Sequence, residues 1–305
     1  MTKDVAYGRV GLLGNPSDIY GGKCISFTFS SFAEVEVKDS LEQRVVNGSS
    51  NIKSHELVDA TLAHLGLKDC PIKLSYRSNI PFGHGLSGSS AIIIAILKTL
   101  NQHFSLGLNR DQIAESALHI EVDDLKIAAG FQDRYVISHG GVCYMDFAGK
   151  EFMRPAEVDG FGTVERLPLD TIPFFLALSS QPKSSGTVHN PLREQFLYGG
   201  DRAREIKYHM DQIAELAELG KDPLVKADWV KVGELMNRNT SLREQISPHN
   251  KLDLDIIDMA LSYGALGAKV AGSGGAVVVL SDKLGTIEKM FRTYACLKPF
   301  IRGYD

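Results

Sequence analysis

The stretch PFGHGLSGSSAIIIAIL, Pro81 to Leu97, joins a loop of small residues to an apolar run. Six of the ten residues from Pro81 to Ser90 are Gly or Ser, and the apolar series begins directly after them at Ala91. The pattern predicts a buried helix over roughly residues 88–104 with a flexible loop in front of it. A helix N-terminus carries unpaired backbone N–H groups and a partial positive charge, so it binds an anion readily when no side chains obstruct it.

We interpret this loop as a phosphate cradle. Its glycines would let a phosphate approach the main chain, and its hydroxyls would cap the helix, bind phosphate oxygens or reach a magnesium ion. The residues concerned are Gly83, Gly85, Gly88, Ser87, Ser89 and Ser90. A plain helix cap is the alternative interpretation of this segment on its own. The loop matches neither GxxxxGK[ST] nor GxGxxG followed by a suitably placed acid.

The composition restricts the class of protein. The chain has 305 residues, of which 44% are hydrophobic and 23% are charged, which is typical of one large or two modest globular domains. A net charge of -4 without a basic run argues against a nucleic-acid partner. The four cysteines form no metal-binding spacing and are expected to be reduced, as in the cytoplasm. No signal core or bilayer-length apolar run occurs, so no membrane anchor is expected.

The pattern changes along the chain. Up to about residue 150, short β-like runs alternate with helical periods, which predicts a sheet with added helices. These helices are expected at residues 54–65, 88–104 and 110–126, the last with Asn109 as its N-cap. The boundary between two domains is placed near Arg154 to Pro173, which gives domains of residues 1–160 and 161–305.

The second part is predicted to be mainly helical. After the strand PFFLALS, the polar segment SSQPKSSGTVHNP is expected to be an irregular connection. Helices are expected at residues 202–219, 224–237, 254–263 and 284–294. Between the last two, AKVAGSGGAVVVLSD predicts a strand, a glycine turn and a strand, and PFIRG predicts a final short strand.

Two further segments are rich in glycine. YGRVGLLGNPSDIYGGK, Tyr7 to Lys23, predicts a strand that runs into a turn. This turn carries Asn15, Ser17 and Asp18, which are short polar residues suited to holding sugar hydroxyls. AKVAGSGGAVVV, Ala268 to Val279, offers a second stretch of accessible backbone amides.

These segments, in this order, resemble the three motifs of the GHMP small-molecule kinase superfamily. More narrowly, RVGLLGNPSDIYGG, GLSGSSA, AGFQDR, GGVCYMDF and GSGGAVVV resemble its glucuronokinase branch. The resemblance spans most of the chain and implies a two-domain α+β fold, ribosomal-S5-like at the N-terminus and ferredoxin-like at the C-terminus. It implies an enzyme that uses ATP and Mg²⁺ to phosphorylate the anomeric hydroxyl of a sugar, with D-glucuronate expected.

The resemblance also implies roles for ionisable residues. Asp133 would face the acceptor hydroxyl as the base, Glu121 would help to hold magnesium, and Arg9 would lie close to the transferring phosphoryl group. The register favours Ser89 over Ser90 as the magnesium-facing hydroxyl. A helix cap for Asp133, a solvated position for Glu121 and a surface position for Arg9 are the alternatives.

The complete expected site has a nucleotide side and a sugar side. The residues expected to contact ATP are Pro81, Gly83, Gly85, Leu86, Ser87, Gly88, Ser89, Ser90 and Ala91. Those expected to contact the sugar are Asn15, Ser17, Asp18, Arg134, Gly272, Ser273, Gly274 and Gly275. Asp123 and Asp124 lie close enough to Glu121 to compete with it as magnesium ligands.

Several alternatives stay open. A uronate requires a cationic partner, for which the candidates are Arg134, Lys183, His189 and Arg193. The sugar could instead be a heptose, fucose or galacturonate, or the chain could be a sensor that binds a sugar and a nucleotide without catalysis. Galactose loses support, because Asn15 and Pro16 follow Gly14 where galactokinases have Glu-His. A monomer or a homodimer is expected.

Overall fold

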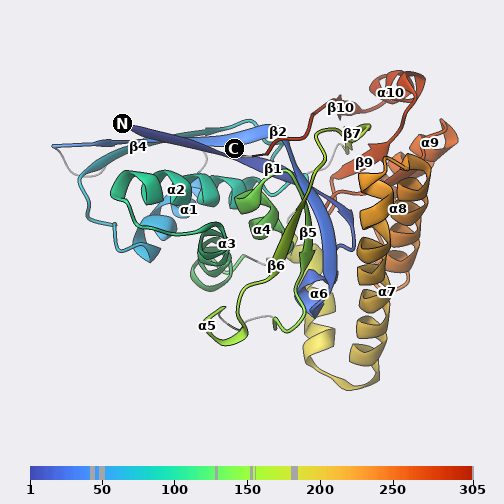
Figure 1. Ribbon diagram of the computed structural model, residues 1–305, viewed down its shortest axis with the longest axis horizontal. Coiled ribbons are helices and arrows are strands. Elements are labelled where there is room, and N and C mark those ends of the chain that lie inside the picture. The colour runs from blue at the N-terminus through green and yellow to red at the C-terminus, as the bar shows by residue number, and fades with distance from the viewer. Residues whose placement is uncertain are drawn as a thin grey trace.

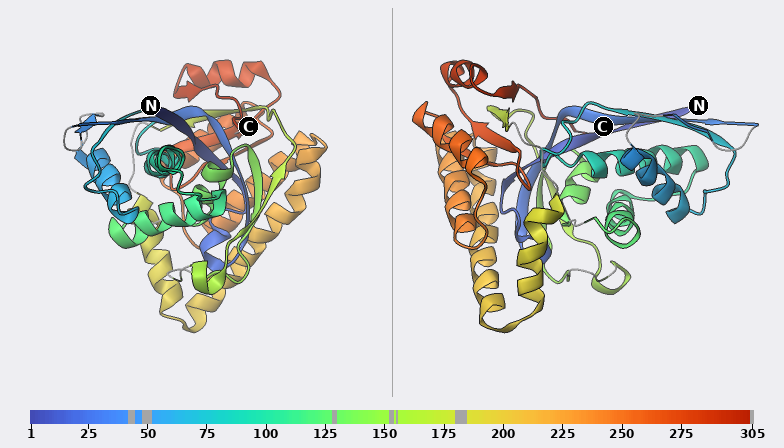
Figure 2. Two further views of the ribbon diagram at one scale, coloured as in Figure 1. Left: turned by 60° about the vertical axis from the view of Figure 1, so that its left-hand side comes forward. Right: turned by 180° about the vertical axis from the view of Figure 1, so that it is seen from behind.

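The computed structural model describes residues 1–41, 45–47, 52–127, 130–151, 154, 156–179 and 185–303. A large sheet and a small sheet organise these residues, with helices packed against both (Figure 1). Seen from behind, the long helices of the second half stand at one end of the molecule, and the blue helix of the first half lies at the other (Figure 2). No helix in the described ranges is long and apolar enough to cross a membrane.

The large sheet is built around one long strand. The sheet has the order β3–β4–β2–β5–β6, and β1 also pairs with β2. Its strands are β1 (Thr2–Leu13), β2 (Lys23–Asp39), β3 (Val45–Asn47), β4 (Ile72–Ser78), β5 (Val142–Asp146) and β6 (Thr163–Leu167). The β1–β2 register shifts between Tyr7 and Arg9 and again between Gly11 and Leu13. Such irregularities bend a strand and redirect its side chains, here around Arg9.

The helices of the first half confirm two expectations and correct one. The helix predicted over residues 88–104 is α2, Gly88–Phe104, whose apolar stretch from Ala91 to Leu97 is buried. Asn109 caps the next helix through a capping box with Gln112, as predicted. That helix does not run on to residue 126, because it changes at Ile120 into a wider π-helical turn in which Leu125 N–H donates to Ile120 O.

The remaining elements of the first half are short or peripheral. They are the 3₁₀ turn η1 (Ser17–Tyr20), α1 (Ile52–His64), α3 (Arg110–His119), the π-helical turn η2 (Ile120–Asp124), α4 (Gln132–His139) and α5 (Ala156–Asp159). Strand β6 extends the large sheet beyond residue 161, and β7 opens the small sheet. The two sheets thus change over between β6 and β7. The domain division between residues 160 and 161 stays a prediction.

The second half combines the small sheet with long helices. The small sheet has the order β10–β7–β9–β8. Its strands are β7 (Phe174–Leu178), β8 (Gly267–Val270), β9 (Ala276–Leu280) and β10 (Ala295–Leu297). The helices are α6 (Ser185–Leu197), α7 (Gly200–Val225), α8 (Trp229–Glu244), α9 (Lys251–Ser262) and α10 (Leu284–Phe291).

Four expectations for this half need correction, the first being the helix predicted over residues 224–237, which is α8 and begins only at Trp229. The predicted irregular connection contains α6 from Ser185 onward, and its residues 180–184 lie outside the described residues. Helix α7 continues past Leu219, because Gly220 packs directly against Leu13 and tertiary contact outweighs the weak helix propensity of glycine. The segment PFIRG forms only isolated bridges, Ile301 with Phe29 and Gly303 with Gly140.

A close backbone crossing joins α8 to β8. A Cβ atom added at Gly233 would lie 2.4 Å from the carbonyl oxygen of Leu266, and one at Gly267 would lie 2.7 Å from Gly233 Cα. Both distances are shorter than real Cβ contacts, so the helix can approach the strand only through these glycines. The crossing fixes α8 against the start of β8.

We expect Gly233→Ala to destabilise the protein by about 1–3 kcal/mol, because the added methyl group forces helix and strand apart. The matched control is Gly285→Ala in α10, where an added Cβ meets nothing within 4 Å. The control should be neutral or stabilising by up to about 1 kcal/mol, because alanine has the higher helix propensity. Urea unfolding measures both changes, and equal midpoints for the two variants would contradict the packing argument.

Candidate functional site

The glycine-rich segments that the sequence singled out meet in space. Arg9 N–H of β1 donates to the carbonyl oxygen of Leu86 in the loop before α2, at 3.2 Å. A Cβ on Gly272, in the turn after β8, would lie 2.3 Å from Gly85 O. The turn and the loop thus touch through their backbones, and three distant parts of the sequence form one site.

The loop before α2 has the conformation that its glycines predict. Gly83 and Gly85 adopt positive φ values of 73° and 62°. Ser87 is also left-handed, and the first bond of the helix runs from Ala91 N–H to Ser87 O at 3.0 Å. The amides of residues 88–90 precede that bond and so have no acceptor within the helix. These amides lie in a half-exposed loop, where they are donors of the kind that can bind an anion.

The side chains of some loop residues are used for packing or for contacts with other elements. The side chain of Leu86 is buried in the core, as is Ala91. Ser87 makes no cap hydrogen bond, and its hydroxyl instead donates to Asp133 Oδ2 at 2.7 Å. The loop is therefore tied by Ser87 to α4.

Three successive residues in the first turn of α4 point to three different partners. Gln132 contacts Asp18, Asp133 contacts Arg9, and Arg134 contacts Glu121. Successive residues of an α-helix are about 100° apart around its axis, so one helical turn faces all three. The sequence AGFQDR thereby positions three carboxylates.

Arg9 holds Asp133 through both oxygens of the carboxylate. Its Nε donates to Oδ1 at 2.5 Å and its second terminal nitrogen donates to Oδ2 at 2.7 Å. The remaining terminal nitrogen donates to Gly85 O at 2.6 Å and Ala271 O at 3.1 Å. Burial alone would raise the pKa of Asp133, but the charge and hydrogen bonds of Arg9, with smaller effects from Arg134 and Ser87, together hold that pKa well below its usual range. Asp133 is thus ionised at neutral pH.

The Glu121 carboxylate is almost completely buried, with 1% of its residue surface exposed. It forms an ion pair with Arg134 and accepts a hydrogen bond from the Ser90 hydroxyl at 3.1 Å. Burial raises the pKa of Glu121, while the charge of Arg134 opposes the rise. The alternative of a solvated helix residue does not describe Glu121.

The hydroxyl next to Glu121 belongs to Ser90, whereas the sequence register favoured Ser89. Within the described residues, no hydrogen bond is found between Ser89 and Glu121. Asp123 and Asp124, the possible competitors of Glu121, are exposed and lie beside His119 instead. The geometry therefore separates Glu121 from its acidic neighbours.

Asp18 lies under the N-terminus of α4. It is 2% exposed and accepts hydrogen bonds from the backbone N–H and the side-chain amide of Gln132, at 3.1 and 3.0 Å. Burial raises the pKa of Asp18, as does the charge of Asp133, while Arg193 on α6 lowers it. Arg193, which is 8% exposed, also experiences the repulsion of Arg134. Of the expected cationic partners, Arg193 and Arg134 thus lie at the site, and Lys183 and the His189 side chain fall outside the described residues.

Asn15 is held by residues that the sequence did not single out. Lys269 Nζ donates to Asn15 Oδ1 at 2.7 Å, and Asn239 Nδ2 donates to Asn15 O at 3.2 Å. Lys269 is buried on β8, and burial lowers its pKa well below the usual value. Arg243 of α8 donates to Gly272 O at 3.1 Å. A lysine inside the otherwise apolar strand AKVAG was the available sequence signal.

Ser17 does not line the site as expected. It is fully buried, and its hydroxyl donates to Lys23 O at 3.1 Å, which stabilises the turn after η1. Gly275 N–H donates to Asp253 Oδ1 of α9 at 3.2 Å, so this amide is bonded within the second half of the chain. Gly272 contacts the Arg9 region, while Ser273 and Gly274 lie against Gly85.

Comparisons with known proteins agree with this architecture. A model of the GHMP kinases N terminal domain matches residues 53–141, and a model of the GHMP kinases C terminal domain matches residues 221–296. "Probable glucuronokinase 2" of Arabidopsis thaliana is 33% identical over 90% of this chain and 82% of its own. "Glucuronokinase 1" of the same plant is 33% identical over 90% of this chain and 83% of its own.

The fold is also that of solved kinases. The crystal structure of a mevalonate kinase from L. major in complex with R-mevalonate matches with a TM-score of 0.76 at 18% identity, over 99% of this chain and 96% of that one. The expected two-domain α+β fold is confirmed. The chain belongs to the GHMP kinase family and is an ATP-dependent small-molecule kinase.

Proposed function

We propose that the chain transfers the γ-phosphoryl group of ATP to the anomeric hydroxyl of D-glucuronate. The observation that carries this proposal is the ionised Asp133, held by Arg9 and Ser87 directly beside the amides at the head of α2. The glucuronokinase names of the Arabidopsis relatives support the choice of sugar. Arg193 supports an acceptor that carries a negative charge, whereas Arg134 already pairs with Glu121.

In this mechanism the loop before α2 binds the phosphates. The N–H groups at the start of α2 and of the half-exposed glycines donate hydrogen bonds to the negatively charged phosphate oxygens. Arg9 lies within the same contact network and stabilises charge that develops on the transferring group. The anomeric oxygen forms a bond to the γ-phosphorus while the bond from that phosphorus to the bridging oxygen of ADP breaks.

Asp133 orients the acceptor hydroxyl and takes its proton as the new bond forms. Its low pKa makes it a weak base, so transfer of the proton occurs late and catalysis relies mainly on positioning. Asp18 contacts Gln132, the neighbour of Asp133 in α4, and together with Asn15 it holds the sugar ring hydroxyls. The Gln132 contacts of Asp18 fix the direction of its oxygens.

The chain also offers oxygen ligands of the kind that Mg²⁺ prefers. Ser90 and Glu121 place a hydroxyl and a carboxylate side by side, 3.1 Å apart, near the head of α2. We propose that these residues hold the magnesium ion, with Ser89 as the alternative hydroxyl. When bound, the ion neutralises phosphate charge.

The site lies in a chain whose four cysteines are all free. This supports a reducing compartment such as the cytoplasm as its location. The choice between monomer and homodimer stays a prediction.

We expect Asp133→Asn to lower kcat by about 10²- to 10⁴-fold, because the acceptor loses its base and its orienting charge. ATP affinity, measured by fluorescence titration, should stay within a few-fold of the parent protein. Asp258→Asn, on the exposed side of α9, is the control and should keep full turnover. A chain that binds ATP and glucuronate but shows no turnover even before mutation would be a sensor, and the kinase mechanism would be wrong.

A second prediction concerns pH. In the parent protein the depressed pKa of Asp133 keeps it ionised through the neutral range, so its protonation limits kcat only under strongly acidic conditions. Arg9→Met removes the stronger of the two positive charges that lower the pKa of Asp133, the other being Arg134, and leaves the burial that raises it. The acidic limb of the kcat profile should therefore move to higher pH.

The shape of the pH profile separates this effect from a general loss of rate in the Arg9 variant. Each profile is normalised to its own maximum, so a uniform loss does not shift the limb. An acidic limb at the same pH in the two proteins would show that Arg9 does not set the ionisation of Asp133.

A third prediction tests the sugar. Arg193→Gln should lower kcat/KM for glucuronate by about 10- to 100-fold, as expected for loss of one charge-assisted hydrogen bond. Turnover of a neutral hexose should change little. Arg202→Gln is the control, because Arg202 is exposed and pairs with Glu205 on α7. An ADP-release assay over a sugar panel gives these values, and an inert glucuronate beside a fast neutral sugar would refute the assignment.

A further inference from the structure

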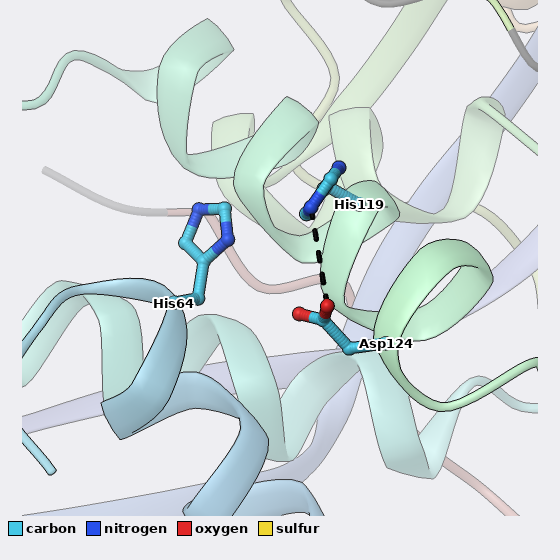
Figure 3. A group of neighbouring side chains, drawn as sticks. All are labelled: His64, His119 and Asp124. Atoms are coloured by element: carbon cyan, nitrogen blue, oxygen red, sulfur yellow. Dashed lines mark ion pairs between the residues drawn. The ribbon is translucent and has the colours of Figure 1, made fainter.

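Two histidines and a carboxylate gather on the surface beyond the kinase site. His64 is the last residue of α1, His119 is the last residue of α3, and Asp124 closes the π-helical turn η2. Figure 3 shows His64 on its own helix, opposite His119 and Asp124. One ligand atom from each of the three side chains lies within 4.8 Å of the others, and all three residues are exposed.

The π-helical turn brings two of these residues together. His119 and Asp124 are five positions apart, a spacing that places side chains on different sides of an ordinary α-helix. The wider turn closes through the bond from Leu125 N–H to Ile120 O, and it moves Asp124 beneath His119. His119 Nε2 then lies 4.0 Å from Asp124 Oδ1 (Figure 3). The interruption of the helix thus builds the cluster.

A neighbouring carboxylate orients the His119 ring. Its Nδ1 lies 2.8 Å from Asp123 Oδ2, and a carboxylate can only accept, so Nδ1 carries the proton. The lone pair of the neutral ring is therefore on Nε2, the nitrogen that faces Asp124. A carboxylate on the far nitrogen of a histidine is the usual partner of metal-binding imidazole. The His64 ring lies 5.2 Å from the His119 ring, centroid to centroid.

We propose that His64, His119 and Asp124 bind a divalent transition-metal ion of the Zn²⁺ type, with water completing its coordination. Zinc binds imidazole nitrogen and carboxylate oxygen at about 2.0–2.2 Å, so ligand atoms around it lie about 3.5 Å apart. The three side chains must approach by about 1 Å, which their exposed rotamers allow. Two imidazoles make this site unsuited to Mg²⁺, which takes oxygen ligands.

The ion would join two elements that carry different parts of the fold. His64 belongs to α1, while His119 and Asp124 flank the turn whose inner face carries the buried Glu121. Bonds to the metal would then add to the packing of α1 against η2 at the surface. The site binds its ion without ATP or sugar, so it is independent of the proposed function.

The test is calorimetric titration of the full chain with ZnCl₂ at pH 7.5, after dialysis against EDTA and without nucleotide, sugar or Mg²⁺. We expect about one ion per chain and an upward shift of Tm with added zinc. His64→Gln, His119→Gln and Asp124→Asn should each weaken binding by about 10-fold or more. All three positions are exposed, so each variant is expected to fold, and its Tm without metal checks this.

Two controls separate this site from other zinc ligands. His55→Gln changes another histidine of α1 outside the cluster, and Cys70→Ser with Cys296→Ser removes the two partly exposed thiols. These variants should bind zinc as the parent protein does. The proposal is overturned if the parent takes up no zinc, if the double variant His64→Gln with His119→Gln binds it equally well, or if the thiol variant loses it.

Discussion

The bidentate contact between Arg9 and Asp133 is the interaction on which the site depends. One guanidinium binds the carboxylate of α4, the carbonyl of Gly85 in the loop before α2, and the carbonyl of Ala271 after β8. Arg9 is only 6% exposed, and a buried charge is costly unless every donor finds an acceptor. Here the cost is offset only if strand, helix, loop and turn stay in register. The position of Asp133 is thus coupled to the assembly of both halves.

The three carboxylates of the site show how environment divides their properties. Asp133 has a pKa below its usual range, whereas burial raises the pKa of Asp18 and Glu121. Asp133 has a guanidinium on both oxygens, whereas Asp18 has the neutral amide of Gln132. Glu121 also has a guanidinium partner, Arg134, but both of its contacts go to Oε2 and burial still raises the pKa of Glu121. Two aspartates can therefore take different proposed roles within one site, Asp133 as the ionised base and Asp18 as a ligand of the sugar.

Local chemistry made some of this structure predictable from the sequence. The helix after the glycine-serine loop and the Asn109 cap depend on residues within a few positions, and both are found where expected. The clustering of Arg9 with Asp133 required the family resemblance, because the residues are far apart in the chain. The π-helical turn and the burial of Ser17 depend on tertiary contacts, which a single sequence does not display.

The residues that sequence reasoning missed share one property: each is a buried polar group whose partner is distant in the chain. Lys269 holds Asn15, and Gln132 holds Asp18. A polar residue in an apolar strand or at a helix start is visible in the sequence, but the acceptor it serves is not. Ser90 illustrates the same limit, since only the fold shows that it, and not Ser89, donates to Glu121.

Different elements carry the backbone contacts around Arg9 and the charge of Arg193, which bears on the proposed sugar specificity. The loop before α2 and the turn after β8 touch through their backbones at Gly85 and Gly272, where no side chain fits, so their spacing is fixed. Arg193 lies on α6, which packs on the first half through an edge-to-face contact of Phe196 with Tyr20. Arg193 makes none of the contacts that hold Arg9 to Asp133, so a substitution of Arg193 on α6 can alter the charge near Asp18 while the Arg9–Asp133 contact stays intact. Under the proposed function, the choice of sugar can thus change without disturbing the residues assigned to phosphoryl transfer.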